Sequence, residues 1–323
     1  MARVLITSPT FGKFSDAIDL LVKAGHKVIK SPYPHPVKEN ELVRIIGEIE
    51  AAVVGMDEMT ADVIRMGEQL KVIARHGVGV DTVDVETATK QGIIVTNALG
   101  ANENAVADVV FGLILSLTRK ICRADASVKQ GKWESIVGIE IWQKTLGIIG
   151  TGKIGRGVVR RAQGFDMNIL AYDICPDPVL AEKFGVQYVS LEDLLGNSDF
   201  ISIHVPLTSE TTGLIGEKQI SLMKKSAYLI NTARGRIVDE KALFISLKEK
   251  KIAGAALDVF SQEPPGYTDL LALGNLLTTP HMAANTEEAI RKMDQICVDN
   301  VIQVLNGNEP ISGVNFPLPF ARG

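Results

Sequence analysis

The sequence predicts an α/β protein made of two doubly wound parallel sheets. Short runs of β-branched residues alternate with amphipathic stretches of helical length almost from end to end, which is typical of parallel strands joined by helical crossovers. A glycine-rich turn at residues 150–155 lies between one of these strands and the helix after it. The length of 323 residues is too great for one small core and indicates two domains.

The first hundred residues predict one complete sheet with its crossover helices. Strands are expected at residues 4–8, 27–30, 51–54, 71–75 and 93–96. Helices are expected between them, at residues 15–23, 39–49, 60–66 and 83–90. The first doubly wound unit is therefore complete near residue 99.

A long apolar helix is expected over residues 102–129. Its apolar residues recur at near-helical spacing, at Ala105, Val109, Leu113 and Leu117. A second apolar row runs alongside, so this helix cannot face solvent all round. Two interpretations stay open, a helix in an interdomain or subunit contact and a core helix within one domain.

A second alternating series follows and predicts the second sheet. Strands are expected at residues 145–149, 168–172, 200–204, 227–231, 253–257 and 276–279. The last helix, residues 287–305, has no strand after it and can return to the first domain. We therefore expect a discontinuous first domain, residues 1–99 plus 286–323, with residues 100–285 inserted as the second domain.

Composition excludes several classes of function. A hydrophobic content of 46%, a charged content of 22% and a net charge of -4 describe an ordinary soluble protein without the basic excess of a nucleic-acid binder. The cysteines are widely separated and form no C-x-x-C pair, so no disulfide framework or metal site is indicated and a cytoplasmic location is expected. They are Cys122, Cys175 and Cys297. The N-terminus begins as a strand and not as a signal peptide, and no apolar stretch is long enough for a membrane span.

The glycine-rich turn has the G-x-G-x-x-G pattern of a Rossmann domain. Gly150 permits the tight turn, Gly152 lets the backbone approach a pyrophosphate, and Gly155 lets helix and strand pack closely. The next strand is followed by Asp173, whose carboxylate can bind both ribose hydroxyls and repels a 2′-phosphate. The sequence therefore predicts that the inserted domain binds NAD and not NADP.

Three polar residues follow strands of the second sheet, where doubly wound sheets place their ligands. Arg234 comes directly after a strand, and its planar guanidinium can hold a carboxylate or carbonyl oxygen with two donors. Glu263 lies in a proline-containing loop, and His281 follows the last strand. A carboxylate beside a histidine stabilises the protonated imidazole that a general acid needs. Together the three predict redox chemistry on a 2-oxo or 2-hydroxy acid.

The chain resembles the D-2-hydroxyacid dehydrogenase family over nearly its whole length, and most closely the phosphoglycerate dehydrogenase-like branch. The resemblance is carried by Arg75-His76-Gly77-Val78-Gly79-Val80-Asp81, Gly131-Lys132-Trp133, Lys144-Thr145-Leu146-Gly147-Ile148-Ile149-Gly150, His204-Val205-Pro206-Leu207-Thr208 and the segments around Arg234, Glu263 and His281. It implies a flavodoxin-like substrate domain, an inserted Rossmann domain and a homodimer formed through the cofactor domain and the long apolar helix.

The resemblance also implies the roles of individual residues. Arg234 binds substrate, His281 is the acid and base, and Glu263 tunes His281. Arg75 and the backbone amides of Val78 and Gly79 contact the substrate. Further cofactor contacts are implied for Lys153, Ile154, Val205, Pro206, Thr232, Ala233, Asp258 and Ala283. The implied reaction is hydride transfer between nicotinamide C4 and substrate C2. Two compact domains joined by crossing segments also predict a hinge that closes on NAD and substrate.

Two segments depart from the phosphoglycerate dehydrogenase pattern. Ser135 follows Gly131-Lys132-Trp133-Glu134 where a basic residue is expected, and Asn97-Ala98-Leu99-Gly100 replaces a more usual Thr-Pro pair. The chain ends soon after the last helix, so a short form without regulatory domains is expected. 3-Phosphoglycerate, glyoxylate and hydroxypyruvate stay open as substrates, and so does an NAD(H)-sensing protein similar to corepressors.

Overall fold

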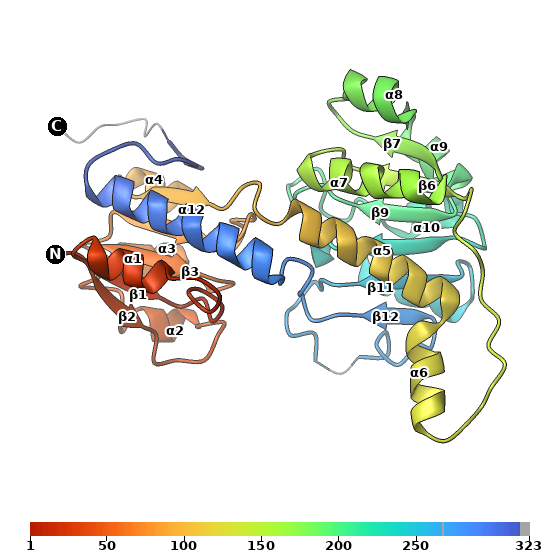
Figure 1. Cartoon of the computed structure of the whole chain (residues 1–323), viewed down its shortest axis with the longest axis horizontal. Helices are drawn as coiled ribbons and strands as arrows, with labels where there is room; N and C mark the ends of the chain where they lie inside the picture. Colours follow the sequence, from red (N-terminus) through yellow and green to blue (C-terminus); the bar gives the residue numbers. More distant parts are fainter. Residues whose placement is uncertain (267, 317–323) are drawn as a thin grey trace. The chain divides into compact units, whose positions relative to one another are not determined.

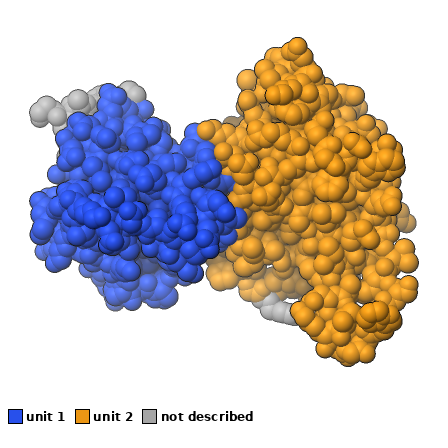
Figure 2. Space-filling view, viewed as in Figure 1, with its two compact units in different colours: residues 1–102, 284–323 blue, residues 103–283 orange. Residues whose placement is uncertain are grey.

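The computed structural model, which describes residues 1–266 and 268–316, divides the chain into two units (Figure 2). Unit 1 contains Met1–Asn102 and the segment from Ala284 onward, and unit 2 contains Glu103–Ala283. Unit 1 is thus discontinuous in sequence. The end of the predicted first domain, residues 317–323, lies outside the described residues.

Unit 1 is built on a five-stranded sheet in which every paired strand is parallel (Figure 1). The strands are β1 (Arg3–Ile6), β2 (Lys27–Lys30), β3 (Ala51–Val54), β4 (Val72–Arg75) and β5 (Ile94–Asn97). Their order is β2-β1-β3-β4-β5, the flavodoxin-like order. β3 and β4 are buried along their whole length, as central strands covered on both faces should be.

The described residues of unit 1 form five helices. They are α1 (Ala17–Lys23), α2 (Glu39–Leu42), α3 (Ala61–Met66), α4 (Val85–Lys90) and α12 (Glu287–Leu305). α12 lies on β4 and β5 beside α1, and it buries Ile290, Cys297 and Val301 at helical spacing. The C-terminal part of the chain therefore completes the core of the N-terminal sheet.

One helix of unit 1 is shorter than expected. The sequence predicts a helix over residues 39–49, but α2 ends at Leu42 and turns follow. Ile45 and Ile49 donate to carbonyls three residues earlier, as in turns and not in an α-helix. The β-branched residues and Gly47 in this stretch favour the helix weakly, which explains the difference.

Unit 2 is built on a seven-stranded parallel sheet with the order β12-β11-β10-β9-β6-β7-β8. This is the Rossmann order extended by one strand, so the predicted fold class is confirmed in both units. The strands are β6 (Thr145–Ile149), β7 (Asn168–Tyr172), β8 (Gln187–Tyr188), β9 (Phe200–Ile203), β10 (Tyr228–Asn231), β11 (Gly254–Leu257) and β12 (Leu276–Thr278). The two-residue β8 was not predicted, because so short a strand has no periodicity to detect.

The helices of unit 2 cover both faces of its sheet. They are α5 (Glu103–Arg119), α6 (Ile121–Lys129), α7 (Lys153–Ala162), α8 (Pro178–Phe184), α9 (Leu191–Asn197), α10 (Glu217–Leu222) and α11 (Glu240–Lys248), with 3-10 turns at Gln163–Phe165 and Gly235–Ile237. The single helix expected over residues 102–129 is broken at Lys120, whose φ of 56° is left-handed. α5 packs on α7, β10 and β11 and buries Val110, Phe111 and Ile114, so it is a core helix of unit 2.

Candidate active site

The residues predicted to be catalytic lie at the carboxyl ends of three neighbouring strands of unit 2. Arg234 follows β10, Glu263 lies in the loop after β11, and His281 lies just beyond β12. His281 Nδ1 is 2.6 Å from Glu263 Oε2. The charge of Arg234 also acts on the Glu263 carboxylate. Unit 2 therefore brings all three residues together.

Glu263 fixes the imidazole of His281 in one orientation. Its other oxygen, Oε1, accepts a hydrogen bond from the Phe260 N–H at 2.9 Å. Burial by itself would raise the pKa of Glu263, but the hydrogen bond and charge of His281, the Phe260 amide and the charge of Arg234 together lower it below the ordinary glutamate value. His281 Nε2 has no hydrogen-bond partner among the described residues. The side chain is 28% exposed, so this nitrogen can exchange a proton with a ligand.

Asp258 holds the turn that carries His281. The His281 backbone has a φ of 49°, a left-handed conformation that is uncommon outside glycine. The buried carboxylate of Asp258 accepts hydrogen bonds from Thr279 Oγ1 at 2.6 Å and from the N–H groups of Met282 and Ala283 at 2.9 Å each. The Asp258 carbonyl accepts a further bond from the His281 N–H at 2.8 Å. These four bonds keep the unusual backbone in place.

Gly235 lets the Glu263 loop pass next to Arg234. A Cβ on Gly235 would lie 1.9 Å from the Phe260 carbonyl carbon and 2.3 Å from the Ser261 nitrogen, so no side chain fits there. Glu240, in the first turn of α11, accepts a hydrogen bond from the Ser261 N–H at 2.5 Å. The close backbone contact and this bond together set the position of the loop.

The glycine-rich turn has the geometry that a dinucleotide site requires. Gly150 has a φ of 95°, and a Cβ there would lie 2.8 Å from the His204 carbonyl. A Cβ on Gly155 would lie 2.1 Å from the Gly150 oxygen, so the helix can approach the turn only without a side chain. Gly152, the residue before α7, has open space where its Cβ would be. A pyrophosphate could occupy that space at the N-terminus of α7, beside Lys153 and Ile154.

Asp173 lies directly after β7, at the carboxyl edge of the sheet. Its Oδ2 accepts hydrogen bonds from Thr151 N at 2.6 Å and Thr151 Oγ1 at 2.9 Å, and its Oδ1 accepts one from Cys175 N at 2.8 Å. Burial would raise the pKa of Asp173, but the bonds from Cys175 and Thr151 outweigh it and lower the pKa. The carboxylate is therefore kept ionised next to the turn, as recognition of ribose hydroxyls requires.

The remaining residues predicted to contact the cofactor lie at the same edge of the unit 2 sheet. They are Val205 and Pro206 after β9, Thr232 and Ala233 after β10, and Ala283 beyond β12. Thr232 Oγ1 is buried and has no hydrogen-bond partner among the described residues, so it is available to a ligand. These residues and the glycine turn fit a bound dinucleotide.

The substrate residues predicted in unit 1 lie at the end of β4. Arg75 is 7% exposed and donates to the His76 carbonyl from Nη1 at 2.5 Å. The Val78 carbonyl accepts a hydrogen bond from Asn97 Nδ2 at 2.8 Å. The N–H groups of Val78 and Gly79 make no hydrogen bond to any described residue. Two neighbouring open amides at a carboxyl edge can bind a carboxylate.

Three residues that support the site were not predicted from the sequence. Thr151 fixes Asp173, and Glu240 fixes the Glu263 loop. His204 lies in one of the segments that carry the family resemblance, but no role is implied for it. It lies beneath Gly150, its Nε2 is 2.8 Å from Ser202 Oγ, and burial lowers its pKa to about 3. None of these positions has a periodicity or spacing that distinguishes it in the sequence.

A family model for the NAD binding domain of D-isomer specific 2-hydroxyacid dehydrogenases matches residues 111–283. The chain belongs to the D-isomer specific 2-hydroxyacid dehydrogenase family. Unit 2 is therefore the NAD-binding domain of this family, and the predicted cofactor is confirmed at that level. The matched segment includes the glycine turn, Asp173 and all three residues of the candidate catalytic trio.

Relatives in the family differ in substrate. The chain is 44% identical to the D-3-phosphoglycerate dehydrogenase of Methanocaldococcus jannaschii over 98% of its own length, but it spans only 60% of that relative. It is also 44% identical to the glyoxylate reductase of Korarchaeum cryptofilum, over 80% of each chain. The crystal structure of D-lactate dehydrogenase from Aquifex aeolicus, complexed with NAD and lactic acid, is 31% identical and covers 98% of this chain and 99% of its own, with a TM-score of 0.85.

No helix in residues 1–266 and 268–316 is both long and apolar enough to cross a membrane. Within the same residues, no group of three or more histidine, cysteine, aspartate or glutamate side chains is arranged to hold a metal ion.

Proposed function

We propose that the protein is an NAD-dependent oxidoreductase that interconverts a D-2-hydroxy acid and its 2-oxo acid. The observation that carries this proposal is the His281–Glu263 pair beside Arg234, on the sheet that also carries the glycine turn. Membership of the D-isomer specific 2-hydroxyacid dehydrogenase family supports it.

The residues that would hold the cofactor are those at the carboxyl edge of the unit 2 sheet. Gly152 and the first turn of α7 bind the pyrophosphate, and Asp173 binds the adenosine ribose. Thr232 Oγ1 offers a buried polar contact. A nicotinamide cofactor held by these residues would supply the exchange of a hydride with substrate C2, in either direction of the reaction.

His281 moves the proton in this mechanism. In reduction its Nε2 donates a proton to the carbonyl oxygen at C2, and in oxidation it accepts the proton of the hydroxyl. The ionised Glu263 stabilises the protonated imidazole through Nδ1. Arg234 binds the substrate and stabilises the charge that develops on its oxygen. The open amides of Val78 and Gly79 bind the substrate carboxylate.

The substrate we propose is a short 2-oxo acid such as hydroxypyruvate or glyoxylate, with phosphohydroxypyruvate as the competing candidate. Ser135 stands where the phosphoglycerate dehydrogenase pattern has a basic residue, which disfavours a phosphate. The identities to one phosphoglycerate dehydrogenase and to one glyoxylate reductase are both 44%, over 98% and 80% of this chain, so activity must decide between these substrates.

A kinetic panel tests this function. NADH consumption is measured with glyoxylate, hydroxypyruvate, phosphohydroxypyruvate and pyruvate, for the wild type and for His281→Ala. We expect one oxo acid to be reduced efficiently, and turnover to fall about a thousandfold or more in the variant while its NADH affinity stays within about twofold. Tight NADH binding without turnover of any acid would favour an NAD(H)-sensing protein, and near-normal turnover by the variant would refute the role of His281.

We also propose a homodimer formed through unit 2. α6 and the segment after it expose large apolar side chains, at Ile121, Val128, Trp133, Val137 and Trp142. Trp133 is 92% exposed and Val137 is 77% exposed, which is unusual for a monomer surface. The long helix predicted over residues 102–129 includes α6, and within that range α5 is buried in the core of unit 2. Light scattering should give the mass of two chains, and Trp133→Ser with Val137→Ser should reduce it to one. A monomeric wild type would refute this proposal.

The cellular location we propose is the cytoplasm. Cys122, Cys175 and Cys297 are all free thiols, and free thiols suit a reducing compartment. Fractionation of the source cells should place the protein in the cytoplasmic fraction, and recovery from an oxidising compartment would contradict the proposal.

A further inference from the structure

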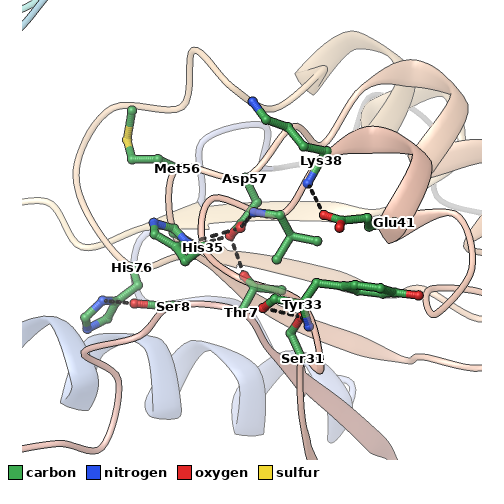
Figure 3. Close-up of polar contacts among 12 residues, drawn as sticks. Thr7, Ser8, Ser31, Tyr33, His35, Lys38, Glu41, Met56, Asp57 and His76 are labelled. Carbon is green, nitrogen blue, oxygen red and sulfur yellow. Dashed lines mark hydrogen bonds and ion pairs between the residues drawn. The ribbon is translucent and has the colours of Figure 1, made fainter. Parts of the chain in front are cut away.

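A buried polar network lies at the end of β4 in unit 1. His76 Nδ1 is 2.9 Å from Ser8 Oγ, a contact drawn in Figure 3. On the other side of the ring, His76 Nε2 is 2.8 Å from Asp294 Oδ1. The other oxygen of Asp294 accepts hydrogen bonds from Ser15 Oγ at 2.5 Å and from Gly12 N at 3.1 Å. The proposed mechanism gives none of these side chains a role.

Asp294 is surrounded by hydrogen-bond partners in an apolar setting. It accepts hydrogen bonds from Ser15 and Gly12, and it lies within hydrogen-bond distance of His76 Nε2. The His76 and Asp294 side chains are 2% and 1% exposed. Ile290 and Met293, close to Asp294 on α12, belong to an apolar cluster. A polar group buried in such surroundings needs every one of its partners.

The network joins three segments that are far apart in sequence. Ser8, Gly12 and Ser15 lie between β1 and α1, His76 follows β4, and Asp294 lies on α12. One turn later on α12, Cys297 Sγ lies 3.6 Å from the Arg75 carbonyl oxygen. Two residues of the C-terminal helix therefore contact the two residues that lead into the turn at Val78.

The turn after β4 is held by hydrogen bonds to its carbonyl groups and by the contacts of His76, and the Gly77 N–H donates to the Arg75 carbonyl at 2.9 Å. The Gly77 carbonyl accepts from Ala98 N at 2.8 Å, and the Val78 carbonyl accepts from Asn97 Nδ2 at 2.8 Å. The N–H groups of Val78 and Gly79 are open among the described residues. Hydrogen bonds are directional, so the Asp294–His76–Ser8 chain restricts the rotation of the backbone from which these amides project.

We propose that Asp294 and His76 are positioning residues that aim the Val78 and Gly79 amides at the substrate carboxylate. This inference rests on the proposed function, because it assigns these amides to the substrate. The pair acts through the turn and does not touch the reacting atoms. A small rotation of the amides weakens carboxylate binding, whereas the NAD site in unit 2 does not depend on it.

The test compares Michaelis constants for Asp294→Asn and for the milder Ser15→Ala. Asp294→Asn keeps the shape of the side chain and replaces one of its acceptor oxygens with an NH2 donor. We expect the KM for the 2-oxo acid to rise about tenfold, and about two- to threefold for Ser15→Ala, with the KM for NADH within about twofold in both. A merely structural role would lower kcat through loss of folded enzyme and leave both KM values unchanged.

Asp57→Asn is the matched control. Asp57 is also fully buried in unit 1 and also paired with a histidine, His35, at 3.2 Å (Figure 3). Its other partners are Thr7, Val37 and Gly55, none of which lies in the turn after β4. We expect Asp57→Asn to lower the melting temperature without raising the KM for the oxo acid.

The outcomes separate the positioning role from the proposed function. If the wild type reduces no oxo acid, both the proposed function and the positioning role are refuted. A wild type that is active, with an oxo-acid KM unchanged in Ser15→Ala and Asp294→Asn, overturns the positioning role alone. An equal rise in Asp57→Asn also overturns it. If Asp294→Asn does not fold, Ser15→Ala decides the question by itself.

Discussion

Glu263 is the residue on which proton transfer by His281 most depends. Because the pKa of Glu263 is lowered, the carboxylate stays ionised at pH values near the ordinary glutamate pKa. It loses its charge only when the pH falls through the lower pKa of the folded state. Glu263→Gln keeps the shape but cannot stabilise an imidazolium. We expect kcat/KM for reduction to fall about a hundredfold and the upper pH limit of reduction to move to lower pH. The measurement is the pH dependence of kcat/KM, with the exposed Glu249→Gln as control. An unchanged profile in Glu263→Gln would contradict this role.

His204 should make unit 2 sensitive to acid. Burial lowers its pKa from 6.5 to about 3, so the folded protein keeps it neutral while the unfolded chain takes up a proton below about pH 6.5. The free energy of unfolding should therefore fall as the pH drops from 6.5 towards 3, by at most about 1.4 kcal/mol per pH unit from this group. Melting temperatures measured across this range should decline less steeply for His204→Gln than for the wild type. Parallel declines would show that His204 does not titrate in this way.

Single residues of the candidate trio could be predicted because their chemistry is distinctive. Arg234, Glu263 and His281 each follow a predicted strand, and a parallel sheet brings such positions to one edge. Asp258 was predicted to line the nicotinamide, and that stays a prediction. What the sequence could not reveal is that its carboxylate is already engaged by Thr279, Met282 and Ala283. Such bonds depend on backbone conformation and leave no pattern in the sequence.

In the glycine-rich turn, Gly152 is expected to matter for NADH binding and Gly155 for the free energy of unfolding. Gly152→Ala adds a methyl group to open space, so the melting temperature should hardly change while the Kd for NADH rises about tenfold or more. Gly155→Ala places a methyl group 2.1 Å from the Gly150 oxygen, and we expect it to lower the free energy of unfolding by about 1–3 kcal/mol. Calorimetry and NADH titration of both variants make the comparison. A stable Gly155→Ala, or a Gly152→Ala with unchanged affinity, would contradict the assigned roles.

Elements with strong periodicity could be predicted well, and irregular ones could not. The last helix was expected over residues 287–305, and α12 occupies Glu287–Leu305. The helix expected over residues 102–129 is two helices, because Lys120 takes a left-handed conformation. No residue pattern around Lys120 predicts that conformation. Residues 43–49 form turns in place of helix, since local propensity there is too weak to extend α2.

In the whole molecule, the residues proposed to bind cofactor and substrate are distributed over both units. Unit 2 carries the glycine turn, Asp173 and the candidate trio. Unit 1 carries the open amides of Val78 and Gly79, and it is completed by α12 from the other end of the chain. The fold of both units could be predicted from alternating strands and helices, whereas the supporting network of His76 and Asp294 could not, because its partners are 218 residues apart.

The central claim is that hydride transfer to C2 of a 2-oxo acid is coupled to proton transfer by His281. Transfer of deuterium from NADH labelled at C4 tests it most directly, with hydroxypyruvate and glyoxylate as acceptors. The account predicts product of D configuration labelled at C2 when hydroxypyruvate is reduced, label at C2 of glycolate when glyoxylate is reduced, and almost no label in product from His281→Ala, although that variant still binds NADH. Absence of label from C2 with every acid in the panel, or labelling by His281→Ala at the wild-type rate, would contradict it.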